Sequence, residues 1–244
     1  MARSPEDQGP RYAIYFVPPP SSRLYRYGSA ILGFDSYTGN SVAFPESFGG
    51  GAVNWNELTA TPRRYGFHAT LKAPFFLAPS CTEQQLVNAL QSFAGLGHAA
   101  HGFEPALREI EDFIAVAPQE AESSLNALAA SCTTIFDAYR APMSPQERAR
   151  RLASGLSQSQ IQNLDRWGYP FVLAEFRFHM TLTGAVPQRR KQAVLAALRE
   201  GLHHMKVEPS ITIERLALMK QETPDAPFRV LDEAVLNVGA GVPS

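Results

Sequence analysis

The sequence predicts an α+β fold with two pseudo-symmetric lobes, each a small antiparallel sheet with outer helices, on either side of a central cleft. The prediction rests on two similar stretches. Residues 65–72 and 175–183 both contain Phe-His-x-Thr-Leu, and their histidines lie 111 positions apart, one in each half of the chain. Each stretch is followed by a stop that contains proline, an amphipathic helix and an extended run. This repeated order indicates an internal duplication.

The two extended runs are themselves alike. Residues 110–116 read Ile-Glu-Asp-Phe-Ile-Ala-Val, and residues 213–219 read Ile-Glu-Arg-Leu-Ala-Leu-Met. Prolines 142 and 145 separate the halves, and the polar helical segment after them carries Arg148, Arg150 and Arg151. We therefore expect a single bilobal domain over residues 1–244, with lobe 1 over about 11–141, a helical linker or lid over about 142–169, and lobe 2 over about 170–238.

The other elements follow from apolar periodicity and from the residues that stop it. Three prolines end a run of aromatic and β-branched residues that begins at Arg11. Thr82 and Gln85 form a capping box ahead of an amphipathic pattern that ends at Gly95. Beyond the two histidine strands we expect a strand over 11–17, helices over 22–32, 82–95, 121–139, 147–167 and 189–204, and extended runs over 103–116, 207–220 and 228–238.

Composition narrows the class of protein. Hydrophobic residues make up 45% and charged residues 18% of the chain, which is typical of a globular protein. The formal net charge of −1 argues against non-specific binding of nucleic acid or anionic membranes, although a local basic cleft is compatible with it. Two cysteines, Cys81 and Cys132, are too few for a disulfide framework, and no Cys/His cluster has metal-ligand spacing. We expect a cytoplasmic protein without metal, cofactor or membrane span.

Side chains alternate between the two faces of a strand, so each histidine stretch is expected to have one polar and one apolar face. The apolar faces carry phenylalanine, leucine, alanine and methionine and suit packing against helices. We interpret the polar faces as two walls of one cleft. The residues expected on them are His68, Thr70 and Lys72 from the first stretch, and Arg177, His179, Thr181 and Thr183 from the second.

Two facing imidazoles suit acid–base chemistry near neutral pH, because histidine titrates near 6.5. A single histidine on a strand is more often an ordinary core or surface residue, but two copies in matching halves favour a shared site. The neighbouring threonines can donate hydrogen bonds to phosphate oxygens, so a phosphodiester fits between the two pairs. Phosphoryl transfer depends mainly on positioning and charge stabilisation, and a metal is not required in principle.

The paired motifs, their spacing and the two-lobed pattern resemble the 2H phosphoesterase superfamily, which includes RNA 2′,3′-cyclic phosphodiesterases and RNA ligase-like proteins. Residues 11–20, 63–75 and 176–184 resemble a bacterial branch whose genes accompany those for carbon–phosphorus lyase in phosphonate metabolism. The resemblance implies that His68 and His179 are catalytic and that Thr70 and Thr181 bind the phosphate.

The resemblance also implies a substrate, a 5-phosphoribosyl 1,2-cyclic phosphate. Lys72 and Arg177 would bind its additional phosphate if they face the cleft, although either charge could instead point to solvent. Tyr15 and Tyr65 are expected as cleft or core aromatics. The alternatives are a nucleoside or RNA-end 2′,3′-cyclic phosphodiesterase, and a binding module that recognises a phosphorylated ligand without turnover. We expect a monomer whose partner is a small phosphorylated substrate, and nucleic acid is not the expected partner.

Overall fold

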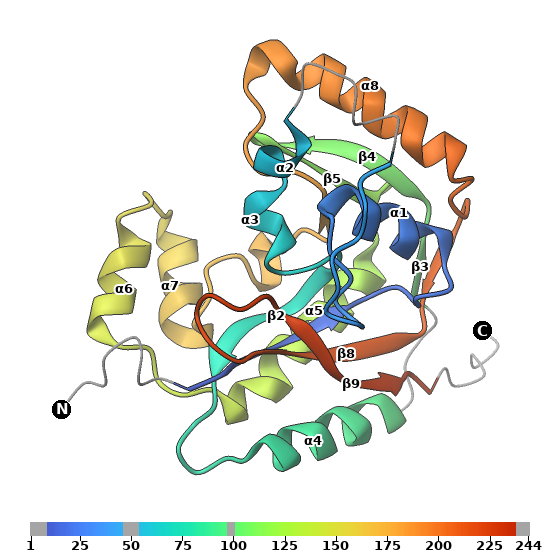
Figure 1. The fold of residues 1–244 in the computed structure, drawn as a ribbon. Helices are drawn as coiled ribbons and strands as arrows, with labels where there is room; N and C mark the ends of the chain where they lie inside the picture. Colours follow the sequence, from blue (N-terminus) through green and yellow to red (C-terminus); the bar gives the residue numbers. More distant parts are fainter. Residues whose placement is uncertain (1–8, 46–53, 97–100, 238–244) are drawn as a thin grey trace.

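The computed structural model describes residues 9–45, 54–96 and 101–237 (Figure 1). A seven-stranded antiparallel sheet forms its centre, with the strand order β4-β5-β6-β2-β1-β8-β9. Its strands are β1 (Arg11–Phe16), β2 (Ala69–Phe76), β4 (Pro105–Ile110), β5 (Phe113–Pro118), β6 (Met180–Thr181), β8 (Arg215–Gln221) and β9 (Arg229–Val235). A second, two-stranded sheet pairs β3 (His101–Phe103) with β7 (Ile211–Ile213). The α+β class and the antiparallel pairing are thus as predicted.

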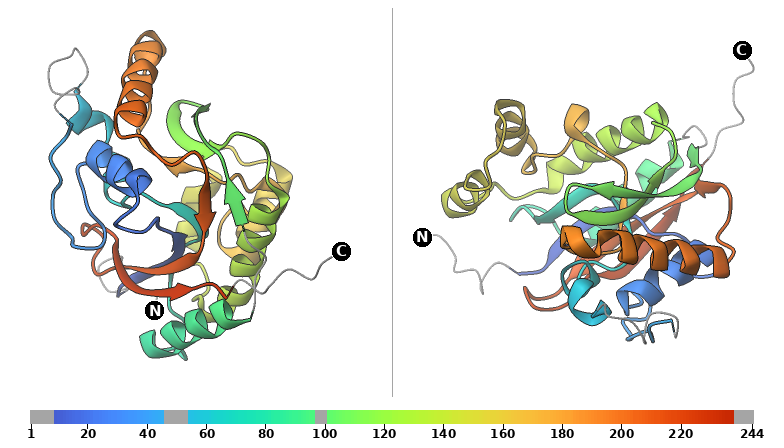
Figure 2. Two further views of the ribbon diagram at one scale, coloured as in Figure 1. Left: turned by 90° about the vertical axis from the view of Figure 1, so that its right-hand side faces the viewer. Right: turned by 90° about the horizontal axis from the view of Figure 1, so that it is seen from above.

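Helices lie against this sheet on several sides (Figures 1 and 2). The helices of the described ranges are α1 (Arg23–Leu32), α2 (Trp55–Leu58), α3 (Ala60–Arg63), α4 (Glu83–Gly95), α5 (Ser123–Ile135), α6 (Pro145–Leu152), α7 (Gln158–Trp167) and α8 (Gln188–His204), with 3₁₀ turns η3 (Phe136–Tyr139) and η4 (Leu173–Glu175). Of these, α6 and α7 pack on each other and stand to one side of the sheet (Figure 1). Helix α4 packs on β8 and β9, α5 packs on β2, and α8 packs on β4. Nowhere in the described ranges is a helix long and apolar enough to cross a bilayer. The cytoplasmic compartment stays a prediction.

The strand pairing exchanges segments between the two halves of the chain. β8 and β9, from the second half, extend the sheet beside β1, whereas β4 and β5, from the first half, pair next to β6. Each side of the sheet therefore contains strands from both halves of the sequence. The predicted division into lobe 1 (11–141), linker (142–169) and lobe 2 (170–238) stays a prediction. Strands from both predicted lobes belong to one hydrogen-bonded sheet.

Both histidines precede their strands rather than lying inside them. Strand β2 begins at Ala69, directly after His68. Strand β6 is only Met180–Thr181, directly after His179. Residues 176–179 follow the 3₁₀ turn η4 in extended chain without strand assignment. The strand expected over 65–72 therefore begins and ends too early, since β2 continues to Phe76. The strand expected over 175–183 is too long at both ends, because β6 is paired on both sides only around Met180.

Two helix predictions illustrate what local signals determine. The capping box of Thr82 with Gln85 is present, and α4 ends at Gly95 as predicted. The single helix expected over 147–167 is instead two helices, α6 and α7, separated around Gly155 with φ +75°. A second capping box, Ser157 with Gln160, starts α7 and is the signal that the sequence analysis missed.

The predicted apolar faces do form the core around the histidines. Six residues of these faces are at most 8% exposed: Phe67, Ala69, Leu71, Phe178, Met180 and Leu182. Helix α1 packs closely against the first of them, because a Cβ on Gly28 would lie only 2.1 Å from the Phe67 ring. Only a glycine allows this approach, and it fixes the chain immediately before His68.

Candidate active site

The site is built by the strand pair in the middle of the sheet. Ala69 of β2 lies opposite Met180 of β6 in antiparallel register. The neighbours of such a pair also face one another, so each histidine comes opposite the threonine of the other motif. Ala69 and Met180 are completely buried on one face. Four partly accessible residues share the other face: His68, Thr70, His179 and Thr181.

A backbone carbonyl orients the imidazole of His68. Its Nδ1 lies 2.9 Å from the carbonyl oxygen of Gly66, and its Nε2 lies 3.1 Å from the Thr70 hydroxyl. Because a carbonyl can only accept, Nδ1 carries the proton, and in the neutral ring Nε2 accepts from Thr70. Gly66 itself has φ +72°, and a Cβ there would meet the Ser36 Cβ at 2.9 Å. This turn therefore requires glycine.

The second histidine repeats this arrangement. Nδ1 of His179 lies 2.8 Å from the carbonyl oxygen of Arg177, again two residues earlier in the chain. The same reasoning places the proton on Nδ1 and leaves the Nε2 lone pair available. The two motifs thus share both a register and a tautomer, which is the local symmetry that an internal duplication predicts.

The surroundings of the two imidazoles differ. His68 lies on the ring of Tyr15, with ring centroids 3.7 Å apart, and the Tyr65 ring lies 6.4 Å away. His179 has Phe113 beside it, at a tilted 5.5 Å. Tyr15 is fully buried and lies opposite Thr70 across β1 and β2. Tyr15 and Tyr65 are therefore aromatic neighbours of His68.

Burial shapes the ionisation of both histidines. Desolvation lowers the pKa of His68 to about 4, against a smaller upward effect of the Gly66 carbonyl, and the nearby charge of His179 lowers it further. Desolvation also lowers the pKa of His179, and the charge of Arg177 acts in the same direction. Both imidazoles are consequently neutral at pH 7 in the free protein, and a bound anion would favour protonating one of them.

Lys72 does not present a free charge to the cleft. Its side chain is 3% exposed, and its Nζ lies 2.7 Å from Asp137 Oδ1 and 3.0 Å from the Thr133 carbonyl oxygen. The free charge expected here is instead paired with Asp137, and the role of Lys72 in substrate binding stays a prediction. Alternation fixes the strand face of a residue but not what packs on that face: here α5 packs on β2, and η3 supplies Asp137.

Arg177 and Thr183 have different environments. Arg177 is exposed and close enough to His179 to affect its pKa. Its role as a phosphate ligand stays a prediction. Thr183 is fully buried, and its hydroxyl accepts a hydrogen bond from the Ile114 amide at 2.9 Å. It serves the fold rather than the polar face on which alternation placed it.

Two aromatic residues near the site were not predicted from the sequence. Phe113 reaches His179 from the start of β5, and Tyr169, just after α7, lies within electrostatic range of Tyr15 and Tyr65. No local signal identifies either residue, because both depend on pairing between distant segments. Within the described ranges, no group of three or more His, Cys, Asp or Glu side chains is arranged to hold a metal ion.

Solved structures similar to this chain include phosphoesterases. A phosphoesterase is 16% identical with a TM-score of 0.38, covering 93% of this chain and 98% of its own. LigT of E. coli, solved with ATP, is 11% identical with a TM-score of 0.40, covering 94% and 98%. A conserved protein of unknown function from Agrobacterium tumefaciens strain C58 is 12% identical with a TM-score of 0.46, covering 96% and 88%.

Two curated proteins match most of the chain. Both are described as ribose 1,5-bisphosphate phosphokinase PhnN. The protein from Janthinobacterium sp. (strain Marseille) is 34% identical over 221 residues, covering 89% of this chain and 49% of its own length. That from Laribacter hongkongensis (strain HLHK9) is 33% identical over 220 residues, covering 90% and 50%. The chain thus spans about half the length of these relatives.

A family profile matches the part of the chain that contains both Thr70 and Thr181. The match runs over residues 70–229, from the second residue of β2 to the first residue of β9, and it includes β6. It covers well over half of the sequence, so the chain belongs to the family described as "Protein of unknown function (DUF1045)".

Proposed function

We propose that this protein is a phosphodiesterase that opens a small cyclic phosphate, with His68 and His179 as its proton-transferring pair. The observation that carries the proposal is the register of Ala69 opposite Met180, which sets each histidine opposite the other motif's threonine. Two imidazoles and two hydroxyls around one space provide a base, an acid and hydrogen-bond donors for phosphate oxygens.

In the proposed reaction, the neutral imidazole of one histidine takes a proton from water while the water oxygen bonds to phosphorus. The bond from phosphorus to one ring ester oxygen breaks, and the protonated imidazole of the other histidine gives that oxygen its proton. One water is consumed, and the products are a phosphate monoester and a free hydroxyl. Thr70 and Thr181 stabilise the non-bridging oxygens, and the proposal assigns no step to a metal ion.

The proposed substrate is a 5-phosphoribosyl 1,2-cyclic phosphate. Cleavage of its ester to O2 leaves phosphates on C1 and C5, which is ribose 1,5-bisphosphate. That compound is named in the description of both curated relatives, whose sequences match this chain over about half of their length. The shared compound supports ribose 1,5-bisphosphate as the product, and we therefore propose that the ester bond to O2 is the one that breaks.

Product analysis tests the proposal. The wild type is given 5-phosphoribosyl 1,2-cyclic phosphate, nucleoside 2′,3′-cyclic phosphates and RNA ending in a cyclic phosphate, with EDTA present throughout. We expect turnover of the ribose compound to ribose 1,5-bisphosphate, and His68→Ala and His179→Ala should each reduce kcat by roughly 10²–10⁴-fold. His204→Ala, an exposed histidine at the end of α8, is the matched control.

Four results would contradict the proposal. Near-normal turnover by either histidine variant would exclude the two-histidine mechanism. Loss of wild-type activity in EDTA would show that a metal takes part. A preference for RNA ends over the ribose compound would make this an RNA-end phosphodiesterase, and binding of all three substrates without turnover would make it a recognition module.

A further inference from the structure

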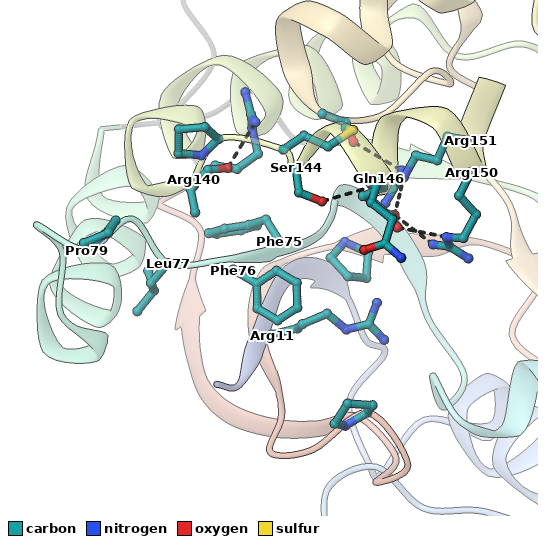
Figure 3. Close-up of a pocket in the computed structure, with 17 residues that line it drawn as sticks. Arg11, Phe75, Phe76, Leu77, Pro79, Arg140, Ser144, Gln146, Arg150 and Arg151 are labelled. Carbon is teal, nitrogen blue, oxygen red and sulfur yellow. Dashed lines mark hydrogen bonds and ion pairs between the residues drawn. The ribbon is translucent and has the colours of Figure 1, made fainter. Parts of the chain in front are cut away.

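A cavity of about 640 Å³ lies between the strand ends of β1 and β2 and the helix α6 (Figure 3). Its volume is within the range of small-molecule sites, roughly 300–1,000 Å³. The lining does not include His68 or His179, so it is not the space between the two motifs. Its charged lining residues are Arg11, Arg140, Glu147, Arg150 and Arg151.

The α6 side of the cavity has an excess positive charge. One carboxylate, Glu147, is shared by two arginines, since its Oε1 lies 2.8 Å from Arg150 Nη2 and 2.7 Å from Arg151 Nε. The three groups together therefore carry a net charge of about +1. Arg11 adds a further positive charge from β1, because its Nε donates to the neutral Gln221 amide oxygen at 2.7 Å. Figure 3 shows Arg11 and Arg150 on facing sides of the cavity.

The side of the cavity near η3 repeats this charge pattern. Asp137 also serves two cations, with its Oδ1 at 2.7 Å from Lys72 Nζ and 2.8 Å from Arg140 Nε. This cluster again has a net charge of about +1, and Arg140 lines the cavity. A chain with an overall formal charge of −1 thus concentrates an excess of about three positive charges here. Such a concavity favours a small anion of high charge.

The cavity lies next to the aromatic rings around His68, which we call the aromatic wall: Phe228, Tyr15 and Tyr65. The Arg11 guanidinium lies 5.5 Å from the centroid of the Phe228 ring. That ring lies 6.1 Å from Tyr15 and is stacked at 5.5 Å on Tyr65. Both tyrosines are neighbours of His68. The ring of Phe228, followed by those of Tyr15 and Tyr65, therefore connects the cationic cavity to the proposed catalytic imidazole.

Helix α6 also contacts an aromatic ring, that of Tyr169. The Arg151 guanidinium lies 5.9 Å from the centroid of the Tyr169 ring, and Arg150 is within electrostatic range of Tyr65. The cationic cavity and the histidine site thus lie on two sides of one group of aromatic rings. Guanidinium groups bind phosphate well because their planar donors match two of its oxygens.

We propose that the arginine-lined cavity is a second anion subsite, which binds the phosphoryl group of the substrate that is not cleaved. The inference rests on the proposed function and assigns the 5-phosphate of the substrate to Arg11 and Arg150. This subsite takes the place of the one expected around Lys72, whose charge is held by Asp137. It also gives the segment 142–169 a role in substrate selection.

The kinetic test compares 5-phosphoribosyl 1,2-cyclic phosphate with ribose 1,2-cyclic phosphate. The measured quantity is the ratio of their kcat/KM values. Arg11→Gln and Arg150→Gln should each lower this ratio on the order of 10- to 100-fold, since each removes a charge-assisted contact. Arg199→Gln is the matched control, because this exposed α8 residue carries the same charge and lies outside the cavity lining. An unchanged ratio in both cavity variants would overturn the subsite.

A binding test separates failure of the subsite from failure of the proposed function. Ribose 5-phosphate is titrated calorimetrically into the wild type and Arg11→Gln, with melting temperatures confirming that both are folded. Weaker binding to the variant supports the subsite even if no cyclic phosphate is hydrolysed, in which case only the proposed reaction falls. Equal binding to both proteins, together with turnover by the wild type, overturns the subsite and leaves the reaction standing.

Discussion

The imidazole of His68 lies flat on the phenol ring of Tyr15, with the centroids 3.7 Å apart and the planes 18° from parallel. Tyr15 belongs to β1, and its cross-strand partner is Thr70, the residue that the His68 Nε2 contacts. One buried ring therefore supports both the imidazole and the threonine of the first motif. The contact fixes the direction of Nε2, which is the atom expected to move a proton.

Substitutions of Tyr15 should separate the ring from the hydroxyl. Tyr15→Phe keeps the stacking surface and removes only the buried hydroxyl, so kcat/KM should fall by less than about 10-fold. Tyr15→Ala removes a fully buried ring and should lower the free energy of unfolding by about 3–5 kcal/mol. Urea denaturation and kcat/KM measure the two effects. A larger kinetic loss in the phenylalanine variant would show that the hydroxyl itself takes part in the reaction.

The ion pair of Lys72 with Asp137 should contribute to stability rather than to substrate selection. Lys72→Met leaves Asp137 with Arg140 as partner, so the loss should be less than the roughly 3–5 kcal/mol typical of a broken buried pair. Asp137→Asn leaves two adjacent cations without their carboxylate and should cost more than Lys72→Met. Urea denaturation gives both values. A selective loss of activity on the 5-phosphorylated substrate in Lys72→Met would restore Lys72 as a substrate ligand.

The apolar face of each motif was predictable because alternation alone determines it. Phe67, Leu71 and Phe178 are buried as expected, and the capping box of Thr82 starts α4 where the sequence places it. These features depend on residues within a few positions of one another. The register of the two motifs agrees with the predicted shared cleft, although their roles in catalysis stay a prediction.

Features that depend on distant segments were not predictable in the same way. The sequence does not show that β8 pairs with β1, because a likeness between two runs does not say which strand either of them joins. Lys72 illustrates the same limit, since Asp137 reaches it from 65 positions away in the chain. The cavity lining joins Arg11 to α6 across more than half of the sequence, so local patterns could not identify it.

The pH dependence of kcat/KM should be bell-shaped, because only the form with one neutral and one protonated imidazole reacts. Burial lowers the pKa of both histidines in the free protein, so the maximum should lie on the acid side of pH 6.5. A bound anionic substrate stabilises the imidazolium, and the profile of kcat should therefore lie at higher pH. The limbs belong to the pair if the histidines couple. A flat profile from about pH 5 to 9, with chemistry rate-limiting, would contradict the mechanism.

The close approach of Gly28 to Phe67 gives a test of how the first motif is held. Glycine to alanine within a helix ordinarily stabilises by about 0.5–1 kcal/mol. Gly95→Ala in α4 should follow this rule, since nothing lies within 4 Å of its added Cβ. Gly28→Ala should instead destabilise, because its Cβ would overlap the Phe67 ring, and kcat/KM should fall as His68 is displaced. Equal effects of the two substitutions would show that α1 can shift without cost.

Stability should also depend on pH through His68. Its pKa is lowered in the folded protein to about 4 by burial, below the value near 6.5 expected in the unfolded chain. The unfolded state then binds more protons between these values, so stability is complete above pH 6.5 and decreases as the pH falls toward 4. By pH 5 the loss from His68 should be about 2 kcal/mol.

The test compares the wild type with His68→Gln, whose side chain cannot titrate. Between pH 7.5 and 5 the variant should lose less of its free energy of unfolding, as measured by urea denaturation. Carboxylates held by cations, such as Asp137, have lowered pKa values and respond only at lower pH. Identical losses in the wild type and His68→Gln would mean that His68 is protonated in the fold as easily as in water.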